Sequence, residues 1–366
     1  MTSARKISPA RIVVGMSGGV DSAVAALLLK RAGHDVHGLY MSNWEDDDGY
    51  CTDAQDFQDA RASAAELGIP LHRVSFAAAY RDRVFDYFLT EYRAGRTPNP
   101  DVLCNREIKF GVCLEYAARL GAQRFATGHY ARLAAGPGGA QLLKARDPDK
   151  DQSYFLHGVE REHFERVSFP LGELRKSEVR ALARTAGLPV FDKPDSTGIC
   201  FIGERPFREF LARYIPTDPG DIVTETGAVV GRHRGLAFYT LGQRGGLEIG
   251  GRAGQREDAW YVAAKNLASN ELIAVQGHDH PLLASRALST GPCNWLVQPK
   301  ALEFASQIKV RYRQADQACH ATMSVDGALE VRFAEPQRAV TPGQFAVLYD
   351  GDRCLGGGVI EHTRPQ

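Results

Sequence analysis

The stretch Gly15-Met16-Ser17-Gly18-Gly19-Val20-Asp21-Ser22 decides the fold of the first part of the chain. The apolar run 12–14 precedes it, and a helical pattern with three consecutive leucines follows it and stops at Gly33. The pattern predicts a strand, a tight turn and the start of a helix. Because glycine has no Cβ, Gly18 and Gly19 allow the backbone of this turn to approach a ligand closely.

The expected turn has the chemistry of an anion site. Backbone N–H groups of a helix's first turn, together with the positive end of its dipole, face a bound anion. Ser17 and Ser22 add hydroxyl groups. The loop lacks the lysine of a Walker P-loop and the G-x-G-x-x-G pattern, and it carries Asp21 instead. An acid beside bound phosphate calls for a divalent cation between them, and Mg2+ suits such a site. An ordinary strand-to-helix turn is the alternative for this loop taken alone.

The hexapeptide 17–22 resembles the pyrophosphate-binding loop (PP-loop) of the N-type ATP pyrophosphatases. Enzymes of that group cleave ATP between the α- and β-phosphates and adenylate a carbonyl or amide oxygen. The resemblance implies that ATP binds at this loop, with Asp21 as a ligand of Mg2+. The residues expected to bind the nucleotide here are Gly15, Met16, Ser17, Gly18, Gly19, Val20, Asp21 and Ser22.

Length and composition indicate a globular chain of several domains. The 366 residues exceed one typical domain, and the composition of 44% hydrophobic and 24% charged residues is ordinary. No apolar run approaches the roughly 20 residues that span a bilayer, and the N-terminus has no signal core. Seven scattered cysteines without a C-x-x-C pair argue against a disulfide framework and a zinc ribbon. We therefore expect a cytoplasmic protein without a membrane partner. Because the net charge is zero, a nucleic-acid partner would need local basic surfaces.

Hydrophobic patterns predict an α/β domain followed by two β-rich units. Strands are expected at 12–14, 36–41, 71–76 and 124–128, and helices at 23–32, 53–67, 80–92, 108–120 and 175–184. This alternation predicts a Rossmann-like parallel sheet with helices on both faces. A hairpin at 131–143 follows, and the basic helix at 175–184 is consistent with a solvated face. Short strands past residue 205 predict a small β-rich unit, a hairpin at 260–275 and a closed C-terminal β-barrel. The expected domains are 1–205, 206–282 and 283–366.

Ligands of parallel sheets bind at the carboxyl ends of the strands. Met41 and Gly128 follow two expected strands, so they are candidates for the walls of an adenine and ribose site. Core packing is the alternative for Met41.

A second informative stretch runs from Thr97 to Asn105. Two prolines, at 98 and 100, predict a rigid extended loop just before a helix. Asp101 and Cys104 then lie near the N-terminus of that helix, where the dipole and Lys109 stabilise a thiolate. A thiol in this setting is a candidate nucleophile. The alternative is a buried small hydrophobe, which is the expectation for Cys113, Cys293, Cys319 and Cys354.

The stretch from Asp195 to Gly203 contains another candidate cysteine. Cys200 follows a polar, glycine-containing loop and does not belong to a periodic apolar face. Two reactive cysteines on separate loops suggest sulfur handling, in which one holds a sulfane sulfur and the other helps release it by forming a disulfide.

These motifs together resemble the tRNA-specific 2-thiouridylase family over essentially the whole chain. They are the hexapeptide 17–22, Asn99-Pro-Asp101 with Cys104, Gly128-His129-Tyr130, and Ser196-Thr-Gly-Ile-Cys200-Phe. In that family ATP adenylates O2 of the wobble uridine at position 34, a persulfide delivers sulfur to C2, and AMP leaves. The resemblance implies that Cys200 carries the persulfide, that Cys104 resolves it, and that Asp101 is the acid/base group.

The resemblance also implies partners and a tRNA surface. The partners are tRNAs that read Lys, Glu and Gln codons, and a persulfide donor protein of a cysteine desulfurase relay. The expected tRNA contacts are Asn99, Pro100, Asp101, His129, Lys150, Asp151, Gln152, Arg311, Tyr312 and Gln344. Lys309, Arg311 and Arg313 would alternate on one face of an expected strand at 302–312, which suits phosphate contact. A solvated edge strand protected by charge is equally consistent with that pattern.

Replacing the second cysteine tests the sulfur-transfer interpretation. Cys200→Ser is expected to abolish formation of 2-thiouridine, because the persulfide would have no carrier, and nucleoside analysis of the tRNA checks this. Full turnover by this variant would favour another adenylating ligase or an amidotransferase. A tRNA-binding module with a vestigial nucleotide site would release no pyrophosphate above background.

Overall fold

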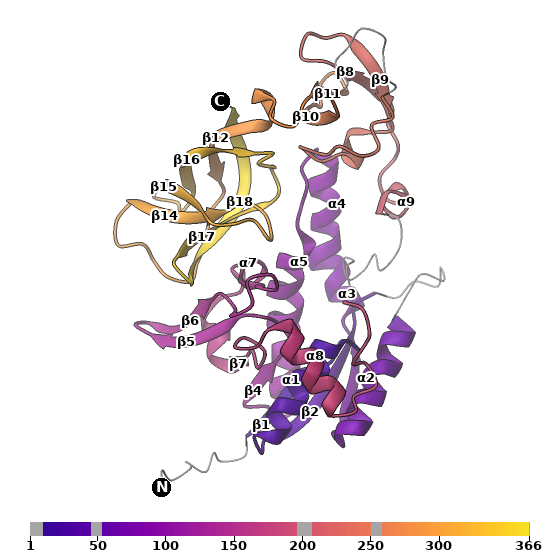
Figure 1. Ribbon diagram of the computed structural model, residues 1–366, viewed down its shortest axis with the longest axis vertical. Coiled ribbons are helices and arrows are strands. Elements are labelled where there is room, and N and C mark those ends of the chain that lie inside the picture. Colours follow the sequence, from indigo (N-terminus) through magenta and orange to yellow (C-terminus); the bar gives the residue numbers. More distant parts are fainter. Residues whose placement is uncertain (1–9, 45–52, 196–206, 250–257, 366) are drawn as a thin grey trace.

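The computed structural model describes residues 10–44, 53–195, 207–249 and 258–365. Its lower part is a parallel five-stranded sheet with the order β3-β2-β1-β4-β7 (Figure 1). The strands are β1 (Arg11–Gly15), β2 (Asp35–Ser42), β3 (Leu71–Ser75), β4 (Arg124–Ala126) and β7 (Val167–Ser168). The predicted Rossmann-like sheet is therefore confirmed.

Helices cover both faces of this sheet, because alternate residues of the central strand point to opposite sides. Ile12 and Val14 of β1 belong to the core formed with α1 and α8, whereas Val13 belongs to a second core that contains Phe110 and Phe125. The helical segments are α1 (Val20–Arg31), α2 (Asp53–Leu67), α3 (Ala77–Tyr80), η1 (Arg81–Phe85), α4 (Asp86–Arg93), α5 (Pro100–Leu103), η2 (Cys104–Val112), α6 (Cys113–Arg119), α7 (Ser153–Leu156), η3 (Arg161–Arg166) and α8 (Lys176–Thr185).

The helix expected at 108–120 begins eight residues earlier, at Pro100. Proline at the first helical position has a suitable fixed φ and no N–H to satisfy, so it starts the helix instead of ending in a loop. The helix continues through a π-helical segment, η2, and then through α6. Asp101 and Cys104 therefore lie inside helical structure.

The middle unit is a four-stranded sheet with the order β10-β11-β8-β9. Its elements are α9 (Phe207–Ala212), β8 (Gly220–Val223), β9 (Val229–His233), η4 (Leu236–Phe238), β10 (Trp260–Asn266) and β11 (Glu271–Gln276). Its core is shared with the helical stretch 77–93, because Phe88 of α4 belongs to the same cluster as Phe210 and Ile222. Figure 1 shows α4 rising into this unit.

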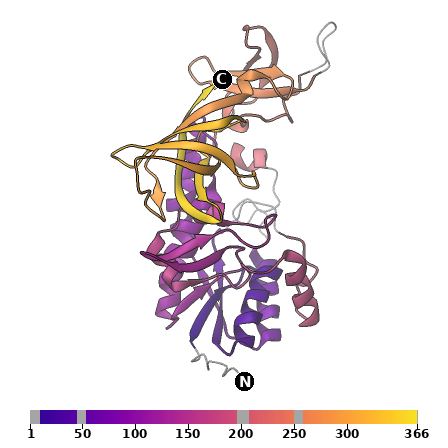
Figure 2. The same ribbon diagram turned by 60° about the vertical axis from the view of Figure 1, so that its left-hand side comes forward.

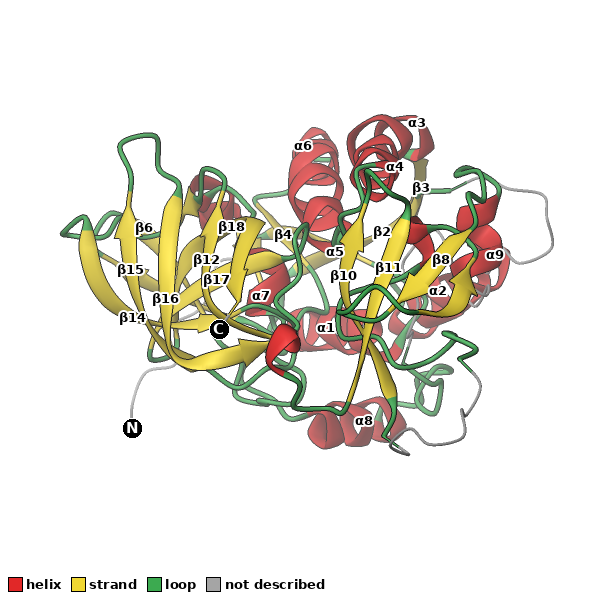
Figure 3. Ribbon diagram, turned by 90° about the horizontal axis from the view of Figure 1, so that it is seen from above, coloured by secondary structure: helices red, strands yellow, loops and turns green. Residues whose placement is uncertain are grey.

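The C-terminal unit is a closed β-barrel, as predicted. Strand β12 pairs with both β16 and β18, so the ring β12-β16-β15-β14-β17-β18 has no free edge among its members. The strands are β12 (Ala284–Thr290), β13 (Asn294–Trp295), β14 (Glu303–Lys309), β15 (Gln317–Met323), β16 (Leu329–Arg338), β17 (Phe345–Asp350) and β18 (Arg353–Pro365), and η5 (Pro281–Leu283) precedes them. Seen from above, the barrel and the middle sheet lie side by side (Figure 3).

The hairpin expected at 131–143 is present as β5 (Arg132–Gly136) and β6 (Gly139–Leu143). It extends the barrel sheet through one pair, Leu143 with Arg353. Figure 2 shows this hairpin, in magenta, beneath the barrel. The expected strand at 302–312 is wrong at its end, because β14 stops at Lys309 and Arg313 adopts a φ of 63° in the following turn. Lys309, Arg311 and Arg313 therefore do not share a strand face.

The predicted burial is confirmed for three of the four cysteines expected in the core. Cys113, Cys319 and Cys354 are buried, and Cys293 is partly buried. Burial raises the pKa of the Cys293 thiol to about 11 and that of Cys354 to about 12. Within the described residues, no helix is both long and apolar enough to cross a bilayer.

The barrel forms hydrogen bonds with Thr97, in the segment that precedes α5. The amide of Thr97 donates to the Pro342 carbonyl at 2.9 Å, and Gln344 Nε2 donates to the Thr97 carbonyl at 2.9 Å. Gly343, between Pro342 and Gln344, has a φ of +93°. It approaches Thr97 so closely that a Cβ on Gly343 would lie 2.8 Å from the Thr97 nitrogen.

Gly343→Ala is therefore expected to lower the midpoint of thermal unfolding, with a cost of about 2–4 kcal/mol from backbone strain and displacement of Thr97. Gly351→Ala is the matched control, because Gly351 also has a positive φ, +59°, but its Cβ would meet nothing within 4 Å. The control is expected to cost only about 1 kcal/mol. Equal midpoints for the two variants would contradict a close contact between the barrel and Thr97.

Candidate active site

The glycine loop between β1 and α1 has the predicted strand–turn–helix form. Gly18 has a φ of +76°, and a Cβ there would lie 2.3 Å from the carbonyl oxygen of Asp56. Ser22 Oγ accepts from the Ser17 amide at 3.1 Å and donates to the Gly19 carbonyl at 3.0 Å. These bonds fix the turn internally and leave the Ser17 side chain exposed. The loop is a preformed cradle whose shape requires glycine.

Asp21 faces a lysine that the sequence pattern did not single out. Lys176 Nζ lies 2.7 Å from each carboxylate oxygen of Asp21, and the Tyr130 hydroxyl donates to Oδ1 at 2.8 Å. Lys176 is the first residue of α8, and its amide donates to Asp147 Oδ2 at 2.8 Å. The helix expected at 175–184 is present, but its first residue turns toward the glycine loop and only 13% of the Lys176 side chain is exposed.

A second lysine, Lys193, connects the glycine loop to α2. Lys193 Nζ donates to the Gly18 carbonyl at 3.1 Å, to Asp56 Oδ1 at 2.7 Å and to Asp59 Oδ2 at 2.5 Å. Burial lowers the pKa of Lys193, but the hydrogen bonds to the two carboxylates outweigh burial and raise it. Lys193 therefore ties the turn to α2 as a fixed cation.

The donor set at the loop fits Mg2+ only in part. The described residues contain no group of three His, Cys, Asp or Glu side chains that could hold a metal ion. Asp21 offers one carboxylate, which bonds Lys176, and the carboxylates of Asp56 and Asp59 are bonded to Lys193. Mg2+ commonly takes one or two carboxylates and completes its shell with phosphates and water. The residues therefore suit a metal that arrives with a phosphate ligand.

Gly128 and Met41 lie at the carboxyl edge of the sheet, as predicted. A Cβ on Gly128 would lie 2.7 Å from the Ser22 nitrogen, so this glycine allows the 127–130 segment to touch the first turn of α1. Met41 is partly buried one residue before the end of β2 and pairs with Val74 of β3. Contact of these residues with adenine or ribose stays a prediction.

Asp101 and Cys104 occupy the first turns of the helix that starts at Pro100. Cys104 is buried, with 1% of its surface exposed. Burial raises the pKa of the Asp101 carboxyl, and the nearby Lys109 ammonium opposes this effect. The π-helical segment that begins at Cys104 contains Gly111 with φ −98° and ψ −106°, and such segments are frequent at functional sites. Cys200 lies outside the described residues, so its distance from Cys104 stays untested.

Asp195 is the last described residue before the segment that contains Cys200, and three cations hold it. Lys150 Nζ lies 2.7 Å from Oδ2, while Lys176 Nζ and Arg180 lie 2.7 and 2.9 Å from Oδ1. Burial raises the pKa of Asp195, but hydrogen bonds from Lys150 and Lys176 outweigh it and lower the pKa to about 2. Lys176 therefore joins the glycine loop to this anchor.

Several expected tRNA contacts have internal partners. His129 is buried between Phe110 and Phe169, and its Nδ1 lies 2.7 Å from Thr127 Oγ1. Burial lowers the pKa of His129 well below its usual value, so the imidazole is neutral. Asp151 Oδ1 accepts from the Ala145 amide at 3.0 Å, and Gln152 Oε1 accepts from the Tyr130 amide at 3.0 Å.

Three further expected contacts, Arg311, Tyr312 and Gln344, belong to the C-terminal unit. Tyr312 packs on Phe155 with ring centroids 4.4 Å apart, and Arg311 donates to the Ala339 carbonyl at 3.2 Å. Gln344 Oε1 accepts from Asn99 Nδ2 at 3.4 Å. The structure thus brings Gln344 onto the Asn99 segment, although 245 positions separate them in the chain.

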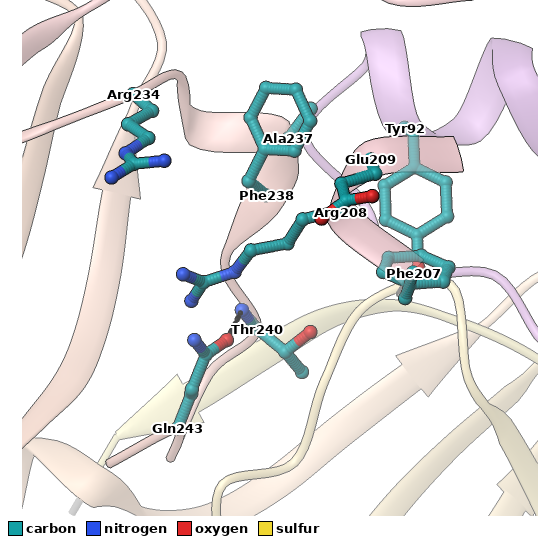
Figure 4. A pocket seen from close by; sticks show the side chains of 9 residues that line it. All are labelled: Tyr92, Phe207, Arg208, Glu209, Arg234, Ala237, Phe238, Thr240 and Gln243. Atoms are coloured by element: carbon teal, nitrogen blue, oxygen red, sulfur yellow. Dashed lines mark hydrogen bonds between the residues drawn. The ribbon is translucent and has the colours of Figure 1, made fainter. Parts of the chain in front are cut away.

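A pocket of 480 Å³ lies outside the glycine loop, between α4 and the middle unit with its helix α9 (Figure 4). Its lining residues are Tyr92, Phe207, Arg208, Glu209, Arg234, Ala237, Phe238, Thr240 and Gln243. None of the predicted site residues within the described part of the chain lines it. Thr240 Oγ1 lies 3.5 Å from Thr97 Oγ1, so the pocket borders the segment that leads to Asn99.

The chain is similar to three described domain families, arranged in order. The tRNA methyl transferase HUP domain matches residues 10–204, the tRNA methyl transferase PRC-barrel domain residues 208–276, and the aminomethyltransferase beta-barrel domain residues 285–360.

Curated relatives match almost the whole chain. The tRNA-specific 2-thiouridylase MnmA of Chromohalobacter salexigens is 58% identical over 356 residues, which cover 96% of this chain and 93% of that protein. The protein of the same name from Marinobacter nauticus is 57% identical over 364 residues, which cover 97% and 93%. Among solved structures, the U34-tRNA thiolase NcsA from Methanococcus maripaludis is 19% identical with a TM-score of 0.36, over 57% of this chain and 67% of that chain.

Gly18→Ala is expected to abolish binding of ATP to the glycine loop, because a Cβ at this position collides with the Asp56 main chain and the turn must open. Gly33→Ala is the control: Gly33 ends α1 with a φ of +85°, but its Cβ would meet nothing within 4 Å. Calorimetric titration with ATP checks both variants. If Gly18→Ala binds ATP as tightly as Gly33→Ala, the loop is not the nucleotide site.

Proposed function

Because the chain belongs to the tRNA-specific 2-thiouridylase family, we propose that it uses ATP to replace O2 of the wobble uridine of tRNA by sulfur. The observation that carries this proposal is the match to relatives of that name at 57–58% identity over almost the whole chain. The geometry supports it, because the glycine loop, Asp101 and Cys104 belong to one α/β unit.

The first step is activation of a poor leaving group. The uridine O2 attacks the α-phosphorus of ATP, the bond to the β-phosphate oxygen breaks, and pyrophosphate leaves. The cradle at Gly18 holds the pyrophosphate with backbone N–H groups and the dipole of α1. Mg2+, when bound with the nucleotide at Asp21, supplies positive charge to the phosphates. The uridine O2 then forms part of an AMP leaving group.

The second step transfers sulfur. A persulfide on Cys200 attacks C2 with its terminal sulfur, and AMP leaves with the former O2. The Cys104 thiolate attacks Cys200 Sγ, the sulfur–sulfur bond of the persulfide breaks, and its electron pair stays with the sulfur on the uridine. A disulfide between Cys104 and Cys200 forms, and an external thiol reductant returns both to thiols.

Asp101 acts on the proton of the target base. Burial raises its pKa above that of an exposed carboxyl, so the Asp101 carboxyl holds a proton more readily and is suited to proton exchange with the base. Asn99 and Pro100 shape the wall beside it, and Gln344 holds Asn99 from the barrel. The uridine must leave the anticodon stack to reach this site.

We further propose the finer features that the family resemblance implies. The substrates are tRNAs that read Lys, Glu and Gln codons, the sulfur donor is a persulfide protein of a cysteine desulfurase relay, and the location is cytoplasmic. The units 1–205, 206–282 and 283–366 serve as a catalytic domain and two β-rich domains that bind tRNA. On the protein surface that binds tRNA, Arg311 and Tyr312 contact the RNA from the turn that follows β14. Lys150, which is bonded to Asp195, contacts it as well.

Two other reaction classes remain as alternatives to be tested. The descriptions of two matching domain families name methyl transfer to tRNA. A different adenylating ligase or amidotransferase would use the glycine loop but would need no cysteine pair. The modified nucleoside itself distinguishes these reactions.

Incubation of unmodified tRNA with the protein, ATP, Mg2+ and a sulfide or persulfide donor is expected to yield 2-thiouridine, identified by mass spectrometry of the nucleosides. Asp101→Asn is expected to lower the rate by roughly 100-fold or more, because the amide cannot exchange a proton with the base. Asp35→Asn is a control for the loss of a carboxylate at the first residue of β2, at the opposite edge of the sheet from the site. A methylated nucleoside, or no thiolation although ATP and tRNA bind, would contradict the proposal.

A further inference from the structure

The ammonium group of Lys176 bonds carboxylate oxygens only, among the residues that the structure describes. Its ammonium group has three N–H bonds, and its three close acceptors are the two oxygens of Asp21 and Oδ1 of Asp195, each at 2.7 Å. An ammonium group between the glycine loop and Asp195 is well placed for a phosphate bound in the loop. Such a phosphate can bond Lys176 only by displacing one of the carboxylates.

Both carboxylates keep other donors if Lys176 leaves them. Among the residues that the structure describes, Asp195 retains Lys150 at 2.7 Å and Arg180 at 2.9 Å, whereas Asp21 retains the Tyr130 hydroxyl at 2.8 Å. Asp195 therefore stays within a network of fixed cations. The Asp21 bond is the one that can be exchanged, because Mg2+ that arrives with ATP can replace the ammonium group beside this carboxylate. This exchange leaves no buried charge without a partner, which would be costly.

We propose that Lys176 binds the terminal phosphates of ATP and gives up its bond to Asp21 when the nucleotide occupies the glycine loop. This inference rests on the proposed function, because that function makes ATP the ligand of the loop. A polyphosphate carries more negative charge than a single carboxylate, so the ammonium group gains by the exchange. Asp21 is released at the same moment, and its carboxylate becomes available to the Mg2+ that accompanies ATP.

The exchange explains two features together. The helix start at Lys176 is fixed by the bond from its amide to Asp147, so the side chain pivots about an anchored backbone. The Lys176 ammonium also lies 5.8 Å from the centre of the Tyr130 ring, whose hydroxyl is bonded to Asp21. Before ATP arrives, Lys176 keeps Asp21 neutralised and reduces its repulsion of the incoming phosphates.

The test compares binding of ATP and of AMP, which lacks the terminal phosphates, by calorimetric titration in the presence of magnesium chloride. Lys176→Met is expected to weaken ATP binding by roughly 10- to 100-fold, the usual value of a hydrogen bond to a charged group. It is expected to leave AMP binding unchanged. Arg184→Met is the matched control, because Arg184 is an exposed cation of the same helix whose guanidinium lies over the Phe191 ring, 5.6 Å from its centre.

Each outcome decides the matter. Equal weakening of ATP and AMP would show that Lys176 only supports the loop, and unchanged ATP binding would remove the contact; either result overturns the inference. Lys176→Gln keeps a donor for Asp195 but loses the charge, so it must show the same selective loss, and it serves if Lys176→Met does not fold. If the wild-type protein binds ATP no more tightly than AMP, the proposed function itself loses its pyrophosphate site.

Discussion

The close contact between Gly18 and the main chain of Asp56 is the constraint on which the site depends. Only glycine fits at position 18, because a Cβ at this position would lie 2.3 Å from the carbonyl oxygen of Asp56. Lys193 reinforces the contact, because it bonds the Gly18 carbonyl and the side chain of Asp56 at once. On the other side of the turn, Gly128 allows the 127–130 segment to touch the first turn of α1. The glycine loop is thus held by contacts on two sides. The free N–H groups in the first turn of α1 therefore have a fixed orientation before a ligand binds.

The chemistry is distributed over units that are far apart in sequence but share their packing. The core of the middle sheet includes Phe88 of α4, so the helices of the first unit support the second. The barrel in turn holds Thr97 and Asn99 through Pro342 and Gln344, which sets the backbone just before Asp101. A ligand that contacts the barrel would therefore contact the same packed body that positions the segment around Asn99.

Patterns of short range predicted much of this fold. The parallel strands and α2 followed from hydrophobic periodicity and from glycine and proline at element ends, and the closed barrel followed from short strands with turn signals. Two errors have local physical causes. The two prolines predict a loop at Pro100, although Pro100 starts a helix. The alternating pattern predicts a strand through residue 312, although β14 ends at Lys309 and Arg313 has a positive φ in the turn that follows. Charge alternation alone does not distinguish a strand face from a turn.

The sequence by itself determined the glycine loop, its place between a strand and a helix, and the candidate roles of Asp101 and Cys104, because turn chemistry depends on residues a few positions apart. Only the tertiary structure decided which cations serve the loop. Lys176 lies 155 positions from Asp21, and Lys193 lies 175 positions from Gly18. In the sequence Lys176 is one of several basic residues on an amphipathic helix. Its partners follow from the packing of α8 against α1, which brings an ammonium group and two carboxylates within hydrogen-bond distance.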